Sequence, residues 1–153
     1  MPGLNSILGL LSAAETVERN LNEGFYTRKA LEQNQQKIVE ANVEQLYEYG
    51  IDSLGIRINM YQPYTPYTVR IKQKKGQPHD RVTLRDTGDF QKSFEVVFEP
   101  VGFYITATDY KTQDLIDKYG AEIFGLTKEN MQEIAVKYVL PVVTEEIKRE
   151  MFG

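Results

Sequence analysis

One acidic turn, Asp86-Thr87-Gly88-Asp89, is the first candidate for chemistry in this chain. An aspartic protease holds two Asp-Thr-Gly segments together as a carboxylate pair that shares one proton. This chain has one such segment, and Arg85 precedes it where those enzymes carry an apolar residue. Asp and Thr side chains also cap turns locally, and glycine adopts the left-handed backbone conformation that a tight turn needs. We therefore interpret this motif as a turn that aims Phe90 and Phe94 into the core.

Other catalytic and metal chemistry is restricted by composition. The chain has no cysteine and a single histidine, His79, so a thiolate site or a site with two imidazoles cannot form within one copy. The spacing of Asp109, Asp114, Asp117 and Glu122 does not match a cation-binding loop, and we interpret them as a solvated helix surface. No phosphate-binding glycine motif or nucleophile elbow occurs. We predict no catalytic residue, no metal site and no cofactor.

A basic segment, residues 70–85, is the second candidate site. It has a local charge of +5 in a chain whose net charge is −4, so the rest of the chain carries −9. Its cations are Arg70, Lys72, Lys74, Lys75, Arg81 and Arg85. Cations can neutralise phosphates, and the preceding Tyr61, Tyr64 and Tyr67 can stack on bases. The alternative is a solvated lysine-rich loop whose neighbouring tyrosines anchor an extended segment to the core.

Helices are expected at both ends of the chain. Residues 13–49 have apolar side chains at helical spacings, with a break near Asn22-Glu23-Gly24 and a stop at Gly50. A further helix is expected at residues 112–119, closed by Gly120. A final helix begins after Thr127, a favourable N-cap residue, and is interrupted near Pro141.

Strands are expected in the middle of the chain. Residues 94–98 and 103–107 alternate apolar and polar side chains around a four-residue connection, which predicts a β-hairpin. Residues 56–60 alternate in the same way and predict a half-buried strand. Residues 61–67 are expected to be extended because of their prolines, and residues 72–80 to form an exposed loop. The predicted fold is α+β, a small antiparallel sheet with a long N-terminal helix and a C-terminal helix packed on it.

The apolar N-terminus is expected to form a separate arm. Leu4, Ile7, Leu8 and Leu11 precede a helix that has its own apolar face, so we predict an arm at residues 1–12 before one domain at residues 13–153. This arm is expected to contact another subunit; the alternative is a terminus that is loose or packed on its own core. No apolar run reaches the length of a membrane span, so no membrane partner is expected.

The segment from Gly50 to Phe94 resembles a known family. It contains a Gly50–Gly55 turn, a Tyr/Pro segment, a lysine cluster, and then Leu84-Arg85-Asp86-Thr87-Gly88-Asp89-Phe90 with Ser93-Phe94. This order is similar to that of virion-morphogenesis and tail-completion proteins of tailed bacteriophages. Those proteins carry a turn, a lysine and a Leu-Xaa-Xaa-Thr-Gly-Xaa-Leu-Xaa-Xaa-Ser motif. The resemblance covers roughly residues 45 to 125.

The resemblance implies a non-enzymatic structural protein of the head–tail junction or tail end. It implies a homo-oligomeric ring, with portal-side connector and tail-tube proteins as partners and the virion, assembled in the host cytoplasm, as the location. The basic segment would then line a DNA-containing lumen or face an acidic neighbour. The alternative function is a small single-stranded nucleic-acid-binding protein that uses residues 61–85.

Overall fold

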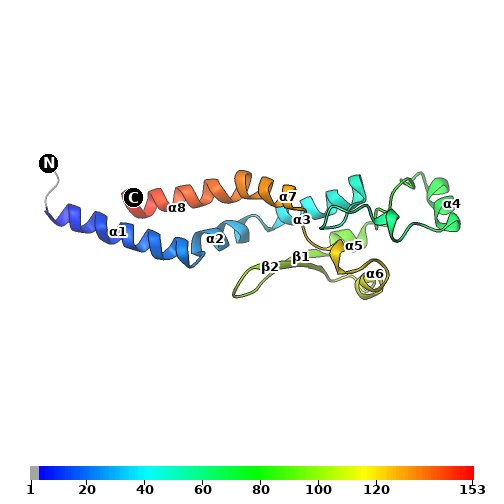
Figure 1. Ribbon diagram of the computed structural model, residues 1–153, viewed down its shortest axis with the longest axis horizontal. Helices are drawn as coiled ribbons and strands as arrows, with labels where there is room; N and C mark the ends of the chain where they lie inside the picture. The colour runs from blue at the N-terminus through cyan, green and yellow to red at the C-terminus, as the bar shows by residue number, and fades with distance from the viewer. Residues whose placement is uncertain (1–3) are drawn as a thin grey trace. The chain divides into compact units, whose positions relative to one another are not determined.

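The computed structural model describes the backbone of residues 4–153 and the side chains from residue 6 onward (Figure 1). It confirms the α+β class: several helices accompany one two-stranded antiparallel sheet. The chain forms two compact units, residues 1–34 with 132–153 and residues 35–131. The helix at the N-terminus runs through residue 12 without a break, so the backbone marks no boundary there. An arm followed by one domain stays a prediction.

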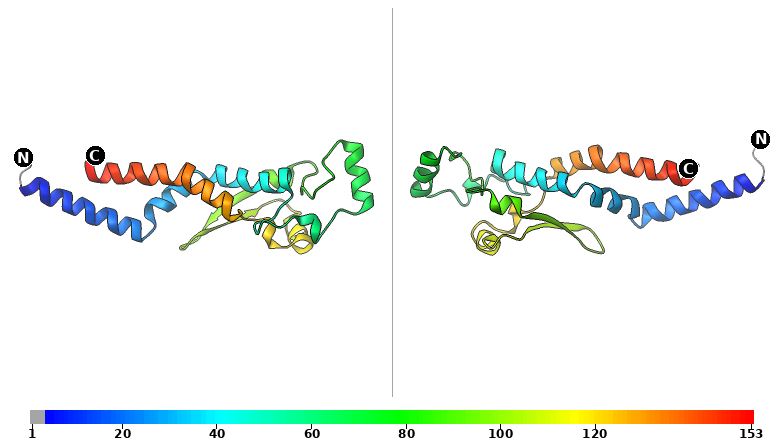
Figure 2. Two further views of the ribbon diagram at one scale, coloured as in Figure 1. Left: turned by 45° about the horizontal axis from the view of Figure 1, so that its top comes forward. Right: turned by 180° about the vertical axis from the view of Figure 1, so that it is seen from behind.

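The first unit is helical. α1 (Leu4–Asn22) and α8 (Leu140–Phe152) lie side by side, and α2 (Phe25–Gln33) packs against both (Figure 2). The predicted break is confirmed, because Gly24 adopts φ 71° between α1 and α2. A hydrogen bond of 2.8 Å from Lys29 to Glu146 joins α2 to α8. The buried apolar side chains of this unit, among those described, are Val17, Tyr26, Ala30 and Ile134.

The second unit contains the sheet. α3 (Gln35–Glu44) continues into a π-helical turn, Gln45–Tyr49, and ends at Gly50 as predicted. β1 (Phe94–Phe98) and β2 (Phe103–Ala107) form the predicted hairpin, and α3 packs along β1. The terminal helices α1 and α8 pack on each other in the first unit, so the helix that covers the sheet is α3. The reason is the break at Gly24 and Asn34, which divides the long N-terminal helix.

The predicted strand at residues 56–60 is wrong. Ile58–Met60 form a turn of 3₁₀ helix, and the pairing nearby is a single bridge between Ile51 and Arg57. Just before this turn, the buried carboxylate of Asp52 accepts hydrogen bonds from the N–H groups of Leu54 and Ile56 at 3.0 Å. A side chain that satisfies its own local backbone removes the donors that a strand would need.

The predicted loop at residues 72–80 is wrong over its first part. α4 (Pro66–Lys75) begins at Pro66, with the Thr65 hydroxyl accepting from the Thr68 N–H at 3.2 Å, and ends at Gly76 with φ 67°. Proline fits the first helical position because the N–H it lacks has no partner there. The prolines of residues 61–67 predicted an extended segment instead, and the start of α4 at Pro66 corrects that expectation.

The helices predicted at residues 112–119 and after Thr127 are confirmed, whereas the short helices at residues 89–92 and 121–123 were not predicted. α5 (Asp89–Lys92) follows Gly88, and α6 (Thr112–Tyr119) ends before Gly120. A 3₁₀ turn, Ala121–Ile123, leads to α7 (Lys128–Ile134), where the Thr127 hydroxyl accepts from the Asn130 N–H. A π-helical turn, Ala135–Val139, separates α7 from α8 just before Pro141. This is the interruption predicted for Pro141, because its ring collides with a regular helical backbone.

Candidate functional site

The turn at Gly88 has the predicted conformation. Gly88 has φ 92°, and the chain after it enters α5 with Phe90 and Phe94 both buried. Their rings meet edge to face at 5.0 Å, and Phe124 lies 5.0 Å from Phe94. A Cβ atom at Gly88 would have Arg85 Nε as its nearest neighbour at 3.6 Å, so space is not the constraint. The positive φ alone explains the glycine.

The acidic residues of this turn serve its structure. Asp86 accepts a hydrogen bond from Lys75 Nζ at 2.7 Å, and this bond lowers the pKa of Asp86 below its ordinary value. The Asp86 carbonyl accepts from Gln77 Nε2 at 3.0 Å, and the Thr87 hydroxyl accepts from the Asp89 N–H. The Asp86 carboxylate is thus paired with a cation. This arrangement supports the interpretation of the motif as a turn.

Lys72 is a buried residue, which corrects its placement in an exposed loop. Its side chain is 7% exposed, and Nζ donates a hydrogen bond of 2.8 Å to the Arg85 carbonyl. Nζ also lies 4.9 Å from the centre of the Tyr64 ring, a cation–π contact. Lys72 therefore joins α4 to the segment that precedes the Gly88 turn.

Two arginines of the basic segment also bind within the chain. Arg81 Nε donates to the Tyr47 carbonyl at 2.7 Å, and its guanidinium pairs with Asp80. The Arg85 guanidinium lies 4.7 Å from the centre of the Tyr47 ring. These contacts join residues 81–85 to the π-helical turn at the end of α3. They reduce the number of cations that the basic segment presents to a partner.

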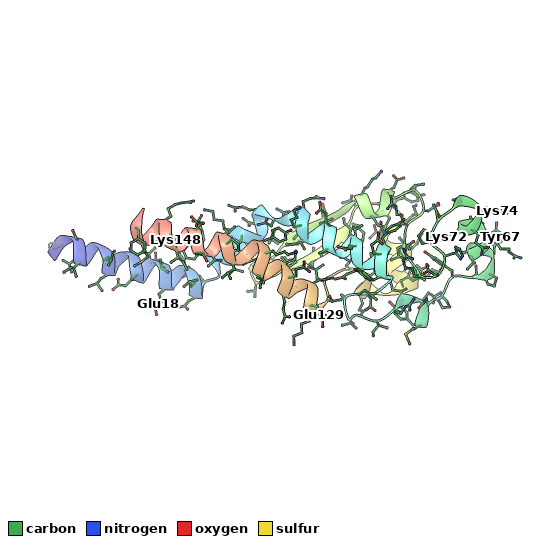
Figure 3. All side chains as sticks on the ribbon, turned by 90° about the horizontal axis from the view of Figure 1, so that it is seen from above. Glu18, Tyr67, Lys72, Lys74, Glu129 and Lys148 are labelled. Atoms are coloured by element: carbon green, nitrogen blue, oxygen red, sulfur yellow. The ribbon has the colours of Figure 1, made fainter. Side chains whose placement is uncertain are left out.

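A small face of α4 keeps exposed groups. Arg70 and Lys74 lie on this helix with Tyr67, which is 67% exposed, at spacings that place all three on one side. Figure 3 shows Tyr67 and Lys74 at the same end of the second unit, with Lys72 directed inward. No ion pair involves Arg70 or Lys74 among residues 6–153.

The other two tyrosines hold the backbone. The Tyr61 hydroxyl donates to Asp52 Oδ2 at 3.1 Å, and the Tyr64 hydroxyl accepts from the Thr83 N–H at 2.9 Å. Of the three tyrosines proposed for stacking, Tyr67 has no such bond within the described chain. The anchoring role therefore fits Tyr61 and Tyr64, while Tyr67 stays a candidate for contact with a partner.

Leu84 adopts a strained conformation beside the turn. Its φ is 56°, a region that branched and bulky residues rarely enter, and its side chain is buried. The neighbouring backbone is held by Gln91, whose Nε2 donates to the Thr83 carbonyl at 2.8 Å, and by the bond from Lys72 to the Arg85 carbonyl. Strain of this kind persists where surrounding contacts fix the backbone.

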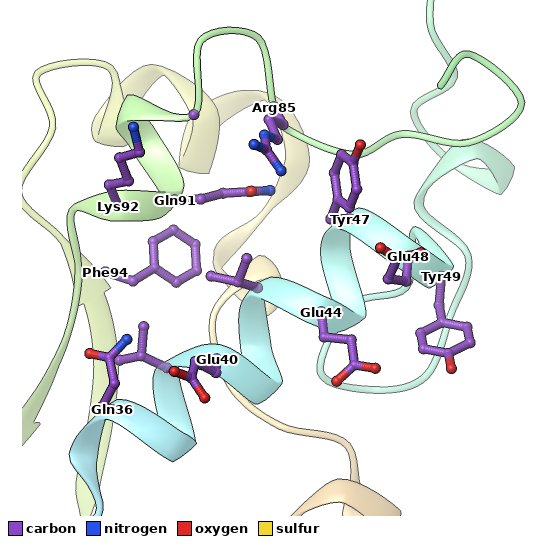
Figure 4. A pocket seen from close by; sticks show the side chains of 13 residues that line it. Gln36, Glu40, Glu44, Tyr47, Glu48, Tyr49, Arg85, Gln91, Lys92 and Phe94 are labelled. Atoms are coloured by element: carbon purple, nitrogen blue, oxygen red, sulfur yellow. The ribbon is translucent and has the colours of Figure 1, made fainter. Parts of the chain in front are cut away.

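A groove of about 750 Å³ lies between α3 and the Gly88 turn (Figure 4). Glu40, Glu44 and Glu48 follow one wall at intervals of one helical turn, and Arg85 and Lys92 stand on the other wall. Apolar atoms of Val39, Val43, Tyr47 and Phe94 also line it. The sequence analysis missed this groove. The four-residue spacing of the glutamates was the available signal, but nothing in the sequence showed what faces them.

The apolar N-terminal residues lie on the surface of the first unit. Ile7, Leu8 and Leu11 of α1 are 48%, 54% and 57% exposed. The side chain of Leu4 lies outside the described residues. These residues are thus available to a partner, and their proposed subunit contact stays a prediction.

The described residues form neither a metal-binding group nor a membrane-spanning helix. No group of three or more His, Asp or Glu side chains in residues 6–153 is placed to hold a metal ion. No helix in the described part of the chain is long and apolar enough to cross a membrane. The acidic residues Asp109 and Asp117 make local bonds, Asp109 to the Lys111 N–H and Asp117 to the Gln113 amide.

No protein-family model, curated protein or solved structure shows a significant match to this chain. The resemblance to phage tail-completion proteins therefore depends on the residues between Gly50 and Phe94 that carry it. The geometry and the exposed surfaces of the described residues are the remaining guide to function.

Proposed function

We propose that this protein is a non-enzymatic structural subunit of a tailed bacteriophage or prophage. In this proposal it forms a homo-oligomeric ring at the head–tail junction or tail end. It contacts portal-side connector and tail-tube proteins, and it is located in the virion.

The observation that carries the proposal is the apolar surface of the first unit. Ile7, Leu8 and Leu11 are exposed on α1 at spacings of one helical face, and Val136, Leu140 and Phe152 are exposed at the other end of the chain. Few apolar side chains of this unit are buried, so its helices leave much of their apolar area in water. Each such side chain stabilises an assembly by about 1.5–3 kcal/mol if a partner buries it fully.

The resembling motif supports the same proposal through its structural role. Gly88 makes the turn, Phe90 and Phe94 enter the core, and the Ser93 hydroxyl donates to the Phe90 carbonyl at 2.7 Å. Ser93 also accepts from the Asp109 N–H at 3.0 Å, which joins α5 to the end of the hairpin. The motif residues thus build a scaffold, as expected for a protein that works through its assembly.

The alternative, a single-stranded nucleic-acid-binding protein, rests on fewer groups than the sequence suggested. Lys72, Arg81 and Arg85 make contacts within the chain, whereas Arg70, Lys74 and Tyr67 face solvent. Short stretches of two cations and one aromatic ring give weak, salt-sensitive binding. We rank this function second.

The test is self-assembly of the full chain. We expect the mass in solution, measured by sedimentation over a range of concentrations, to rise to that of a closed oligomer, with rings visible by electron microscopy. Replacing Ile7, Leu8 and Leu11 with Gln should weaken assembly while the thermal unfolding curve changes little, since these side chains are exposed.

The matched control replaces Ser6 and Ser12, which are exposed polar residues of the same helix, with Gln. This variant should assemble like the wild type. A chain that stays monomeric at every concentration, and forms no rings, would contradict the proposed function. A triple variant that unfolds at a much lower temperature would show that the apolar residues stabilise the monomer instead.

A further inference from the structure

The hydrogen bonding of the hairpin defines which backbone groups are free. The Thr108 N–H donates to the Ser93 carbonyl and the Glu99 N–H to the Gly102 carbonyl, just beyond the two ends of the ladder. Hydrogen-bonded pairs alternate with non-hydrogen-bonded pairs in an antiparallel ladder. Phe103, Ile105 and Ala107 therefore direct their N–H and C=O groups away from β1, toward the outer edge of β2.

The outer edge of β2 is open in the described chain. α3 packs along β1, whereas no helix or further strand packs to a similar extent along β2. In the described chain the N–H groups of Phe103, Ile105 and Ala107 donate to no backbone carbonyl, and the Ala107 carbonyl accepts one long bond, 3.4 Å, from the Thr112 hydroxyl. In Figure 1 the hairpin extends away from α5 and α6, which leaves β2 uncovered.

The composition of β2 gives this edge no protection. Proteins guard open edges with charged side chains, proline or a bulge. Residues 103–108 contain no charge and no proline, and the register of β1 with β2 is regular, without a bulge. β1 differs, because Glu95 lies within it and Glu99 follows it. A strand that meets β2 finds no charge to repel it.

We propose that two copies of this chain pair through β2, antiparallel and about a two-fold axis at Ile105. The free groups fix the register, because hydrogen-bonded pairs must join residues whose N–H and C=O groups face outward. Phe103 then lies opposite the second copy's Ala107, and Ile105 opposite its own equivalent. The hairpins become one four-stranded sheet.

Both faces of this sheet are compatible with the pairing. Phe103, Ile105 and Ala107 share the buried side of the hairpin, so their apolar side chains continue across the axis. On the other side Tyr104, which is 47% exposed, lies opposite Thr106 of the second copy. A two-stranded sheet is marginal alone and gains stability when further strands extend it. A β1–β1 pair would instead bring Glu95 close to a second glutamate.

Pairing through β2 is a second contact between copies of this chain, in addition to the ring contact of the proposed function. It rests on that function only in taking a second copy as the partner. A two-fold pair is closed and cannot grow into a ring, so pairing through β2 would give a dimer. The ring would instead form through the apolar surface of the first unit. The two surfaces can be tested separately.

The experiment uses cysteine pairs, since the natural chain has none. Tyr104→Cys and Thr106→Cys chains are prepared separately, each with a different tag, and then mixed and oxidised. Opposed residues in a non-hydrogen-bonded pair have Cα atoms about 4.5 Å apart, whereas identical residues are diagonal at about 7–8 Å. The mixture should give at least about 5-fold more disulfide dimer than either chain alone, because disulfides do not span larger separations.

The control mixtures test other partners of the same edge. Glu95→Cys mixed with Val97→Cys tests a β1–β1 pair, and Tyr104→Cys mixed with Glu95→Cys tests a β2–β1 pair. We expect neither to link. Preferential linkage in either control, or no linkage of 104 with 106, would overturn the proposal. If residues 104 and 106 do not link while the mass in solution still rises with protein concentration, the β2 pair is refuted but the ring contact is not. A chain that is monomeric at every concentration refutes both the β2 pair and the ring.

A charge exchange gives an independent check without oxidation. Lysines at both Tyr104 and Thr106 should abolish the pair, as should glutamates at both, because like charges meet across the axis. Mixing the two variants should restore it. The control variant carries Asn22→Lys and Gln132→Lys, at exposed residues of the other unit, and should pair like the wild type.

Discussion

At the scale of single residues, contacts made by a few side chains fix the backbone before the Gly88 turn. Leu84 has a positive φ of 56°, and the residues on either side of it are bonded to Lys72, Tyr64 and Gln91. Lys72 makes this contact from α4, 13 residues earlier in the chain. A lysine that the sequence places in a charged surface segment is thus part of the core.

Lys72→Gln should lower the free energy of unfolding by about 1–3 kcal/mol, because it removes a charge-assisted bond from the buried Lys72 to the Arg85 carbonyl. Lys74→Gln is the matched control on the same helix and should change it by less than about 0.5 kcal/mol, since Lys74 is exposed. Urea unfolding measures both. Equal unfolding free energies would show that Lys72 is merely solvated.

Tyr119 should make stability fall at high pH. Burial, with a smaller effect of Tyr64, raises the pKa of Tyr119 from 10.0 to about 12. The folded chain keeps the phenolic proton that the unfolded chain loses, so this contribution is complete below pH 10 and disappears as pH rises from about 10 to about 12. Tyr119→Phe should lose less stability over this interval than the wild type.

The control for this pH effect is Tyr110→Phe, because Tyr110 is 88% exposed. This variant should follow the wild-type loss of stability between pH 10 and 12. Chemical unfolding at each pH gives the comparison. Identical pH slopes for Tyr119→Phe and the wild type would remove Tyr119 from the explanation.

At the scale of elements, two buried amides attach the segment before α7 to α3. Asn42 Nδ2 donates to the Ile123 carbonyl at 3.0 Å, and its oxygen accepts from the Gly125 N–H at 2.9 Å. Gln45 donates to the Gly125 carbonyl, and its oxygen accepts from the Thr127 N–H and from Asn130 Nδ2. This segment has little regular structure, so side chains satisfy its backbone.

Gln45→Met should therefore lower the free energy of unfolding by about 2–4 kcal/mol, because it removes the partners of the buried Thr127 N–H and of the part-buried Gly125 carbonyl. Amide hydrogen exchange at Thr127 should accelerate more than exchange in β1. Gln36→Met, an exposed position of the same helix, is the control and should have little effect. Unchanged exchange at Thr127 in Gln45→Met would contradict this role.

At the scale of the whole molecule, the two units differ in how well they bury apolar area. The second unit has a core drawn from α3, the hairpin and the segments around them, including Ile38, Leu46, Ile58, Val82, Phe90, Phe94 and Ile123. The first unit buries few apolar side chains among those described and exposes many. This difference is why the proposed assembly contact belongs to the first unit.

The distribution of charge over the molecule gives a prediction for nucleic-acid binding. If Arg70 and Lys74 are the cations of the basic segment that meet phosphates, log affinity for a single-stranded oligonucleotide should fall with log salt at a slope of roughly −1.4, against roughly −4 for all six cations. Arg70→Gln with Lys74→Gln should abolish this slope and leave the melting curve unchanged. A slope near −4 in the wild type would favour the nucleic-acid-binding function. Fluorescence anisotropy over a salt series measures it.

Elements whose signals are local could be predicted from the amino-acid sequence. Six features follow from residues within a few positions of each other. They are the breaks at Gly24 and Gly50, the hairpin at residues 94–107, the Thr127 cap, the interruption near Pro141 and the positive φ of Gly88. The α+β class followed from the same local patterns.

Features that depend on partners far apart in the chain could not be predicted in this way. Residues 56–60 alternate like a strand, but in the described chain their pairing is a single bridge from Arg57 to Ile51, and Asp52 accepts a hydrogen bond from the Ile56 N–H. Lys72 became buried because the Arg85 carbonyl needs a donor, and Glu40, Glu44 and Glu48 became one wall of a groove because the Gly88 turn lies opposite them. Periodicity shows which side of an element is apolar; it does not show which segment meets that side, because this depends on contacts between residues far apart in the chain.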